Sequence, residues 1–222
     1  MTLSKESQAR EDICRVGKSL FDRGYVHATA GNISVRLDDG FLITPTDACM
    51  GFLDPAKLAK LDTGAQQVSG DRASKTIALH TRVYSATDPF NIHAGCIIHA
   101  HSTHCVALTL QSSNTELLGA LTPYFVMKVG HVPVISYYRP GSPATAIEVA
   151  DTIKAYGERG TPIRAVALPR LGPVVWAASP FEAMAVLEEL EETAKLVCLQ
   201  PNTAPLTAAQ IEDLRQTFGA VW

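Results

Sequence analysis

The sequence lacks several features that mark common classes of protein. Its five cysteines are odd in number, scattered, and without a CxxC pair, so neither a disulfide framework nor a cysteine-based zinc site is indicated. No apolar run is long enough to span a bilayer. The first residues, MTLSKESQARED, lack the apolar core of a signal peptide. We therefore expect reduced thiols, a cytoplasmic location and no membrane partner.

A basic surface is also missing. Formal net charge is −3, from 19 lysines and arginines against 22 acidic residues, and there is no basic block. Because binding to phosphate backbones depends on clustered positive charge, we expect no nucleic-acid partner. The 222 residues, 46% hydrophobic and 18% charged, suffice for one well-packed globular unit. Without a repeat or linker in the chain, we predict a single domain over 1–222.

The spacing of apolar residues predicts alternating helices and strands. Helices are expected over 4–23, 74–86, 102–110, 142–160, 179–200 and 206–218. Strands are expected over 32–37, 40–46, 94–101, 131–137, 163–169 and 172–179, with a helical turn and a strand within 53–62. Since the tight turn DDG joins the first two strands, we expect an α/β domain whose sheet is mixed or antiparallel.

Three histidines occur close together in IIHAHSTHC, residues 97–105. Residues two apart on a strand point to the same side, so His99 and His101 should project together from the strand's end. Two imidazoles on one face of a strand commonly begin a site for zinc or another divalent metal. The alternative is that both are hydrogen-bonded structural histidines. We expect His104 to orient its neighbours through hydrogen bonds.

Five motifs, in this order and spacing, resemble the class II aldolase/adducin family. They are TAGNISVR (29–36), FLITPTD (41–47), ASKTIALHTRVY (73–84), IIHAHSTHCVAL (97–108) and GPVVWAASPFEAM (172–184). Together with PVISYYRPGS (133–142), they most resemble its 3-oxo-tetronate 4-phosphate decarboxylase branch. The resemblance implies a three-layer α/β/α domain with a central, mostly antiparallel sheet. It also implies a homotetramer with active sites between neighbouring subunits.

The resemblance further implies a metal-dependent carbon–carbon lyase. Family members use a divalent metal as a Lewis acid that stabilises an enediolate, and the same electron sink promotes loss of CO₂ from a β-keto acid. We therefore expect a decarboxylase of a small, sugar-derived keto acid, with or without a phosphate. Zinc is the first choice of metal, with Mn, Fe, Co and Ni as alternatives. An aldolase, an iron-dependent oxygenase and a catalytically degenerate scaffold remain open.

Two departures from the family pattern fall at its central positions. The family's third metal-binding histidine lies in an NHG segment that aligns with Arg170-Leu171-Gly172, so Leu171 replaces that ligand. The family's catalytic glutamate aligns with Thr76, whose hydroxyl is a poor general base. Arg170 could instead place a fixed positive charge beside an anionic intermediate.

The missing third ligand leaves open alternatives among the other histidines. His27, His93 and His131 all fall in expected loops or strand ends, and any one could supply it. His131 is slightly favoured, because an irregular segment precedes it. His80, on its helix, is expected to be a hydrogen-bonded structural residue.

The substrate-binding part of the family pattern is partly retained. Gly31, Asn32, Thr46 and Ser74 match phosphate-binding positions, whereas Asp47 replaces a glycine and would repel a phosphate. Lys75 could pair with a substrate anion or with Asp47. The segment Tyr137-Tyr138-Arg139 could line the site, or simply end a strand at a Pro-Gly turn. The predicted residues are, for catalysis, Lys75, Thr76, Tyr138 and Arg170; for substrate, Gly31, Asn32, Thr46, Asp47, Ser74, Lys75 and Arg139; for metal, His99 and His101.

Overall fold

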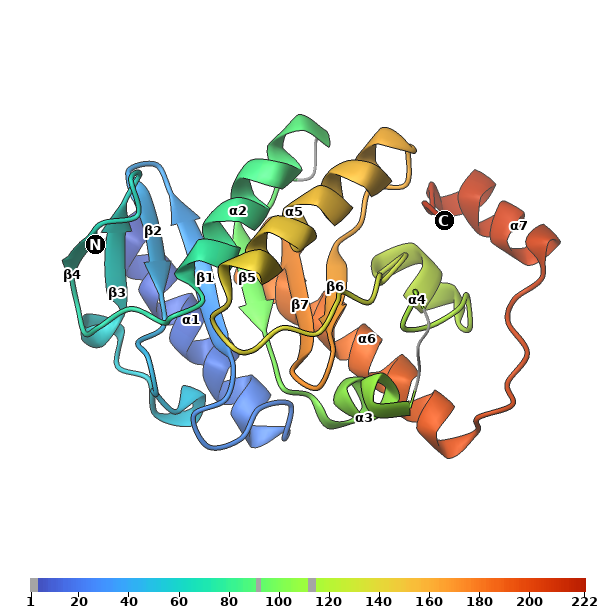
Figure 1. The fold of residues 1–222 in the computed structure, drawn as a ribbon, viewed down its shortest axis with the longest axis horizontal. Coiled ribbons are helices and arrows are strands. Elements are labelled where there is room, and N and C mark those ends of the chain that lie inside the picture. Colours follow the sequence, from blue (N-terminus) through green and yellow to red (C-terminus); the bar gives the residue numbers. More distant parts are fainter. Residues whose placement is uncertain (1–3, 91–92, 112–114) are drawn as a thin grey trace.

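The computed structural model describes residues 4–90, 93–111 and 115–222, and these form a single sheet between helices (Figure 1). The strands are β1 (Asn32–Leu37), β2 (Gly40–Ile43), β3 (Ala59–Asp62), β4 (Gln67–Ser69), β5 (Cys96–His99), β6 (Ala165–Leu168) and β7 (Gly172–Ala177). Their order is β4-β3-β2-β1-β5-β7-β6, and every neighbouring pair is antiparallel. The predicted α/β fold with a mostly antiparallel sheet is confirmed.

Helices cover both faces of this sheet. The helices are α1 (Lys5–Asp22), α2 (Ile77–Thr87), α3 (Thr103–Gln111), α4 (Pro123–Lys128), α5 (Pro143–Glu158), α6 (Pro180–Leu199) and α7 (Ala208–Phe218). Side chains alternate along β5, so Ile98 joins the core beneath α1 and α6 while Ile97 joins the core beneath α2 and α5 (Figure 1). None of the described helices is long and apolar enough to cross a membrane.

The predicted elements agree with the structure except at a few places. The predicted strand over 131–137 is wrong: this segment makes only isolated bridges, at Pro133 and Val134. Proline has no N–H to donate to a ladder, which explains the interruption. Helix α2 begins at Ile77, later than predicted, because residues 74–76 form a turn. The short elements α4 and β4 were not predicted.

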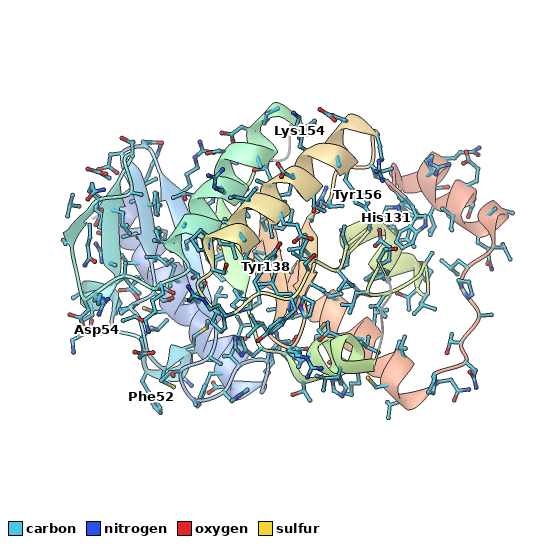
Figure 2. All side chains as sticks on the ribbon, in the orientation of Figure 1. Phe52, Asp54, His131, Tyr138, Lys154 and Tyr156 are labelled. Carbon is cyan, nitrogen blue, oxygen red and sulfur yellow. The ribbon has the colours of Figure 1, made fainter. Side chains whose placement is uncertain are left out.

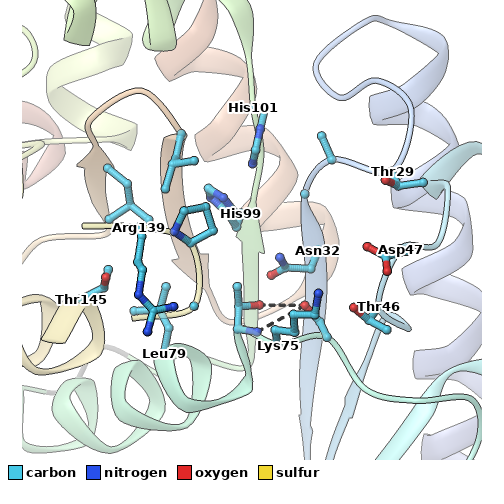
Figure 3. A pocket seen from close by; sticks show the side chains of 18 of the residues that line it. Thr29, Asn32, Thr46, Asp47, Lys75, Leu79, His99, His101, Arg139 and Thr145 are labelled. Carbon is cyan, nitrogen blue, oxygen red and sulfur yellow. Dashed lines mark hydrogen bonds between the residues drawn. The ribbon is translucent and has the colours of Figure 1, made fainter. Parts of the chain in front are cut away.

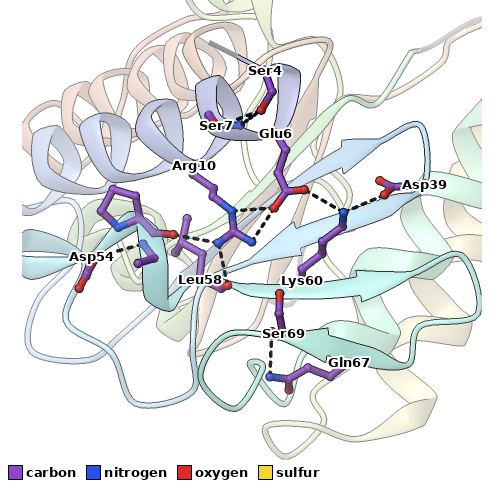
Figure 4. A network of polar contacts seen from close by, with 12 residues as sticks. Ser4, Glu6, Ser7, Arg10, Asp39, Asp54, Leu58, Lys60, Gln67 and Ser69 are labelled. Carbon is purple, nitrogen blue, oxygen red and sulfur yellow. Dashed lines mark hydrogen bonds and ion pairs between the residues drawn. The ribbon is translucent and has the colours of Figure 1, made fainter.

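A polar network ties α1 to the sheet edge (Figure 4). Glu6 of α1 accepts hydrogen bonds from Arg10 at 2.9 Å and from Lys60 of β3 at 2.8 Å. Lys60 also bonds Asp39 at 2.7 Å, and Arg10 donates to the carbonyl of Leu58 at 3.0 Å. These bonds fix the N-terminal helix against β3 and the turn between β1 and β2.

Two glycines allow the backbone to pack tightly around the end of β5. Gly31 has φ +84°, and a Cβ there would lie 2.7 Å from the carbonyl oxygen of His99. Gly172 has φ +98°, and a Cβ there would lie 2.3 Å from the carbonyl oxygen of Ala100. Only glycine tolerates both conditions. The start of β1 and the start of β7 are therefore pressed against the histidine-bearing strand from opposite sides.

A buried carboxylate anchors the helix that follows the histidines. Glu191 of α6 accepts hydrogen bonds from the backbone N–H groups of His104 at 2.8 Å and Cys105 at 3.0 Å. It also bonds Nδ1 of His104 at 2.9 Å. Burial alone would raise the pKa of Glu191, but these N–H donors hold it below its ordinary value. The start of α3 is thus held by a carboxylate 87 positions along the chain from His104.

We predict that Glu191→Ala lowers the free energy of unfolding by roughly 2–3 kcal/mol, because two backbone N–H groups lose a charged acceptor. Urea unfolding followed by circular dichroism measures the change. Glu192→Ala is the matched control, since Glu192 is exposed and, among the residues that the structure describes, its carboxylate bonds Tyr25 and Lys195. An equal loss in both variants would contradict the anchoring role.

Candidate active site

A cavity of about 530 Å³ opens at the end of β5 (Figure 3). Segments far apart in the sequence line it: residues 27–32, 45–47, 74–79 and 139–145, with His99, His101, Leu168 and Leu171. It therefore brings together most residues that the sequence singled out: Gly31, Asn32, Thr46, Asp47, Ser74, Lys75, Thr76, His99, His101 and Arg139.

His99 and His101 lie together at one end of this cavity (Figure 3). Their ring centroids are 4.9 Å apart. Nδ1 of His99 lies 3.0 Å from the carbonyl oxygen of Pro173. Because a carbonyl can only accept, Nδ1 carries the proton and Nε2 is left free to bind a ligand. This second contact is the arrangement that normally orients a metal-binding histidine.

Both imidazoles are neutral at pH 7. Burial, and next the neighbouring His101, lower the pKa of His99 to about 4. Burial, and next His27, lower the pKa of His101. A neutral imidazole is the form that binds metal, so the pair has the protonation state that a metal site requires.

The third position of the expected metal site holds a leucine. Leu171 lies in the turn between β6 and β7, where its N–H donates to the carbonyl of Leu168 at 3.1 Å. Its alkyl side chain packs on the core beneath α2 and α5 and has no donor atom. Within the described ranges, no three His, Cys, Asp or Glu side chains converge closely enough to hold a metal ion. The pair thus fits two ligands of a metal, and Leu171 supplies no third.

A hydroxyl stands where a carboxylate base is expected. Thr76 precedes α2, and its Oγ1 lies 3.0 Å from Oγ of Ser74. Ser74 is buried, and its N–H donates to the carbonyl of Thr44 at 3.2 Å. Together these residues give the cavity wall two linked hydroxyls without negative charge.

Asn32 presents an unused hydrogen-bonding group to the cavity. Its side chain is buried and, in Figure 3, points toward the space between the walls. Its amide oxygen finds no partner among the residues that the structure describes. Buried polar atoms are rarely left unpaired, so this amide is suited to a hydroxyl or other donor of a bound molecule.

Two cations and one anion set the charge of the cavity. Figure 3 shows Lys75 and Arg139 on different walls, with Asp47 beside Thr46. In the described part of the chain neither cation forms an ion pair, so the suggested Lys75–Asp47 pair is not formed here. Asp47 has φ +58°, a backbone conformation that favours glycine. The cavity is therefore net cationic and suited to an anionic ligand.

Two residues predicted to be catalytic do not line the cavity. Arg170 is exposed, and its backbone N–H donates to Oγ1 of Thr109 at 2.9 Å. Tyr138 packs at the edge of the core beneath α5, where Glu148 raises the pKa of its phenol. Sequence reasoning did not select Thr29 and Thr145, which do line the cavity. Small hydroxyl residues in loops carry no pattern that would have pointed to them.

A buried polar cluster supports the cavity from below. Oγ of Ser34 lies 2.7 Å from Nδ1 of His80 and 2.7 Å from the hydroxyl of Tyr84. Burial, and next His99, lower the pKa of His80 to about 3. His80 is therefore a neutral structural residue, in the position that its sequence context suggested.

We predict that the protein loses stability as the pH falls from about 6.5 toward 4. Burial places the pKa of His80 at about 3 and that of His99 at about 4, below the ordinary 6.5. In this window the unfolded chain takes up protons that the folded chain does not. The stabilisation is therefore fully present above the pKa that the histidines have in the unfolded chain. Below it, the free energy of unfolding declines by about 1.4 kcal/mol for each histidine and each pH unit of acidification.

Urea unfolding across this pH range tests that prediction. His80→Gln should remove one histidine's contribution to the slope of the unfolding free energy against pH. His93→Gln, at an exposed position outside the cavity, is the control. An unchanged profile in His80→Gln would contradict the account.

We also predict that Asp47→Gly and Asp47→Asn both strengthen binding of inorganic phosphate. The repulsion between two like charges is worth about 1 kcal/mol here, so its removal corresponds to a several-fold gain in affinity for phosphate. Asp47→Gly should in addition raise the free energy of unfolding, because glycine adopts φ +58° without strain. Calorimetric titration and urea unfolding separate the two effects. Weaker phosphate binding by both variants would show that Asp47 does not oppose the anion.

Comparisons with known proteins agree with this geometry. Residues 11–198 match the family model described as "Class II Aldolase and Adducin N-terminal domain". The chain is 50% identical to a 3-oxo-tetronate 4-phosphate decarboxylase of Cupriavidus necator, over 99% of this chain and 100% of that protein. It is 40% identical to a protein of the same name from Pectobacterium atrosepticum, over 96% and 95% of the two chains.

Solved structures show the same architecture. The crystal structure of YgbL from Escherichia coli, called a putative aldolase/epimerase/decarboxylase, superposes with a TM-score of 0.83 at 37% identity. That match covers 96% of this chain and 100% of the other. An L-fuculose 1-phosphate aldolase superposes with a TM-score of 0.80 at 24% identity, over 98% of each chain, which shows the shared fold.

Proposed function

Because this chain belongs to the class II aldolase and adducin family, we propose that it is a lyase that decarboxylates a 3-oxo-tetronate 4-phosphate. The observation that carries this proposal is one cavity that joins a neutral histidine pair to two unpaired cations, Lys75 and Arg139. Such a substrate carries a phosphate at one end and a carboxylate at the other. The cavity offers a positive charge for each.

The polar groups of the cavity suggest how the substrate lies. Lys75, with the hydroxyls of Ser74 and Thr46, is suited to the phosphate, and Arg139 to the carboxylate. The unpartnered amide of Asn32 is suited to the hydroxyl between them. Asp47 lies beside the phosphate position and weakens binding there, so affinity depends on Lys75.

Decarboxylation of a β-keto acid requires few functional groups from the protein. In a β-keto acid the bond to the carboxylate carbon breaks, CO₂ leaves, the electron pair moves toward the ketone, and a proton then takes the vacated position. A divalent metal bound at His99 and His101 would supply a Lewis acid for the ketone oxygen. Arg139 would hold the carboxylate out of plane with the ketone, and the cavity walls would limit access of water.

Thr76 favours decarboxylation over aldol cleavage. Aldol cleavage requires a base that removes a hydroxyl proton, and the hydroxyl of Thr76 is a poor base near neutral pH. Loss of CO₂ requires no such proton removal, because the carboxylate is already ionised. A chain with Thr76 and Leu171 can therefore retain decarboxylation where aldolase activity would be lost.

The finer details of the expected enzyme belong to the same proposal. We infer a zinc-dependent, cytoplasmic homotetramer whose sites lie between subunits. Exposed aromatic side chains support an assembly: Phe52 is 81% exposed and Tyr137 is 62% exposed. Tyr137 lies two residues before Arg139, so a neighbouring subunit that covered it would also enclose the cavity.

The test of the function is release of CO₂ from 3-oxo-tetronate 4-phosphate by the purified protein supplied with zinc. We expect turnover with this substrate and little or none with L-fuculose 1-phosphate. If no CO₂ is released while the aldolase substrate is cleaved, the aldolase alternative replaces this proposal. If neither reacts, the lyase proposal fails, and the oxygenase and scaffold alternatives are left.

We predict that Lys75→Ala and Arg139→Ala affect the two ends of the substrate differently. Each should lower kcat/KM by roughly tenfold to a hundredfold, the worth of about 1.5–3 kcal/mol for a hydrogen bond to a charged group. Lys75→Ala should leave kcat/KM for the unphosphorylated acid unchanged, whereas Arg139→Ala should lower kcat/KM equally for the phosphorylated and unphosphorylated substrates. Arg159→Ala, an exposed arginine at the end of α5, is the control. Equal loss in all three variants would contradict the assignment.

A further inference from the structure

The histidine pair requires another protein ligand if it is to hold a metal firmly. Catalytic zinc sites normally have three protein ligands and one open position. Here two imidazoles are in place, and the third expected position, Leu171, has no donor atom. Within a single chain, the further ligand must therefore come from a different part of the cavity wall.

The chain contains seven histidines, and the structure separates their roles. His80 is buried with Nδ1 bound to Ser34, and His104 is bound to Glu191. Neither they nor His93 line the cavity.

His131, which the sequence slightly favoured, lies elsewhere. Its ring stacks on Trp222 with centroids 4.4 Å apart, and its Nδ1 is 3.4 Å from Glu116. Figure 2 shows it beside Tyr156, on the side of the molecule that faces α7. The remaining histidine, His27, is the one that lines the cavity together with His99 and His101.

We propose that His27 is the third protein ligand of a divalent transition-metal ion at this site, in place of the side chain at position 171. The proposal concerns the same site as the proposed function and rests on its being a metal site. Compared with the family pattern, this assignment places the third ligand on the opposite side of β5. The expected ligand would come from the β7 side of β5, whereas His27 comes from the loop that leads into β1.

Geometry supports this assignment. Imidazoles that share a tetrahedral zinc have ring centroids roughly 5 Å apart, given zinc–nitrogen bonds of about 2 Å. The His99–His101 separation of 4.9 Å already meets this condition. The His27 and His101 centroids are 6.5 Å apart, with the rings nearly perpendicular at 77°. Because no three such side chains converge among the described residues, the ring of His27 has to move toward His101, by roughly 1.5 Å between centroids, before the two can share an ion.

The local backbone can hold His27 in place while its side chain makes that approach. The carbonyl of His27 accepts a hydrogen bond from the N–H of Ala30 at 2.9 Å, and Val26 is buried. The ring of His27 is exposed, so staggered rotamers other than the one observed are open to it. Ala28 adopts φ +48°, a conformation uncommon for alanine, which turns the chain at this point. A backbone held by a hydrogen bond and a side chain with space to change rotamer suit a residue that closes onto an ion.

Three imidazole nitrogens define the class of ion. Nitrogen ligands of this kind suit zinc, iron, cobalt or nickel better than magnesium or calcium, which prefer oxygen. The site would retain the full double positive charge of the ion and leave a position for the oxygen atoms of an anionic substrate. It thereby compensates for the repulsion from Asp47.

The test measures metal binding without substrate. Affinity for Zn²⁺ is determined by competition with a chromogenic chelator, and Co²⁺ loading is followed by its visible absorption. His27→Ala should weaken Zn²⁺ binding by at least the roughly 10–100-fold that loss of an outer-shell partner costs, and should change the Co²⁺ spectrum. His99→Ala should abolish binding, and His93→Ala, at an exposed histidine outside the cavity, is the matched control.

A rescue variant separates loss of a ligand from loss of fold. His27→Ala combined with Leu171→His should regain tight binding, because the imidazole returns on the other side of β5. Unchanged affinity in His27→Ala, or absence of metal binding by the unmodified protein, would overturn the proposal. Metal bound through His27 without CO₂ release would refute the proposed function alone. CO₂ release together with a Zn²⁺ affinity that is unchanged in His27→Ala would refute this inference alone.

Discussion

The packing of two glycines against the backbone of the histidine strand is the constraint on which the site depends. Gly31 and Gly172 let β1 and β7 approach the carbonyl groups of His99 and Ala100 more closely than any side chain would allow. This approach sets Asn32 opposite His99 in the sheet and places the β6–β7 turn beside His101. The cavity is thus a consequence of backbone contacts first, and its side chains can change without loss of the fold.

That separation explains how the site can be altered at several positions and still be well formed. Leu171 is accommodated by packing on the apolar core beneath α2 and α5, and Thr76 by a hydroxyl contact with Ser74. Asp47 has φ +58°, a conformation that glycine adopts without strain. Each of these residues is accommodated by local contacts. The histidine pair and the Asn32 amide, which match the family pattern, line the same cavity as the two cations.

Much of this could be read from the sequence. The spacing of apolar residues predicted most elements. The HAH spacing predicted that the side chains of His99 and His101 lie together, and their rings are 4.9 Å apart at the end of β5. The strand predicted over 131–137 failed because Pro133 has no N–H to donate to a ladder, a local property that the spacing of apolar residues alone leaves out of account. Similarly, the start of α3 is held by Glu191, which is distant in the sequence.

The same limit applies to the site residues. Sequence spacing could not choose between His27, His93 and His131, because that choice depends on which loop folds over the end of β5. Nor could it place Arg170 outside the cavity, since a turn residue next to a site residue can point either way. Long-range contacts decide both questions.

The most direct test of the account is CO₂ release from 3-oxo-tetronate 4-phosphate by chelator-treated protein, followed as Zn²⁺ is added back. The account predicts that activity is lost on chelation and rises in proportion to bound zinc until each chain holds one ion. Full zinc occupancy without CO₂ release, or CO₂ release that does not depend on bound zinc, would contradict it.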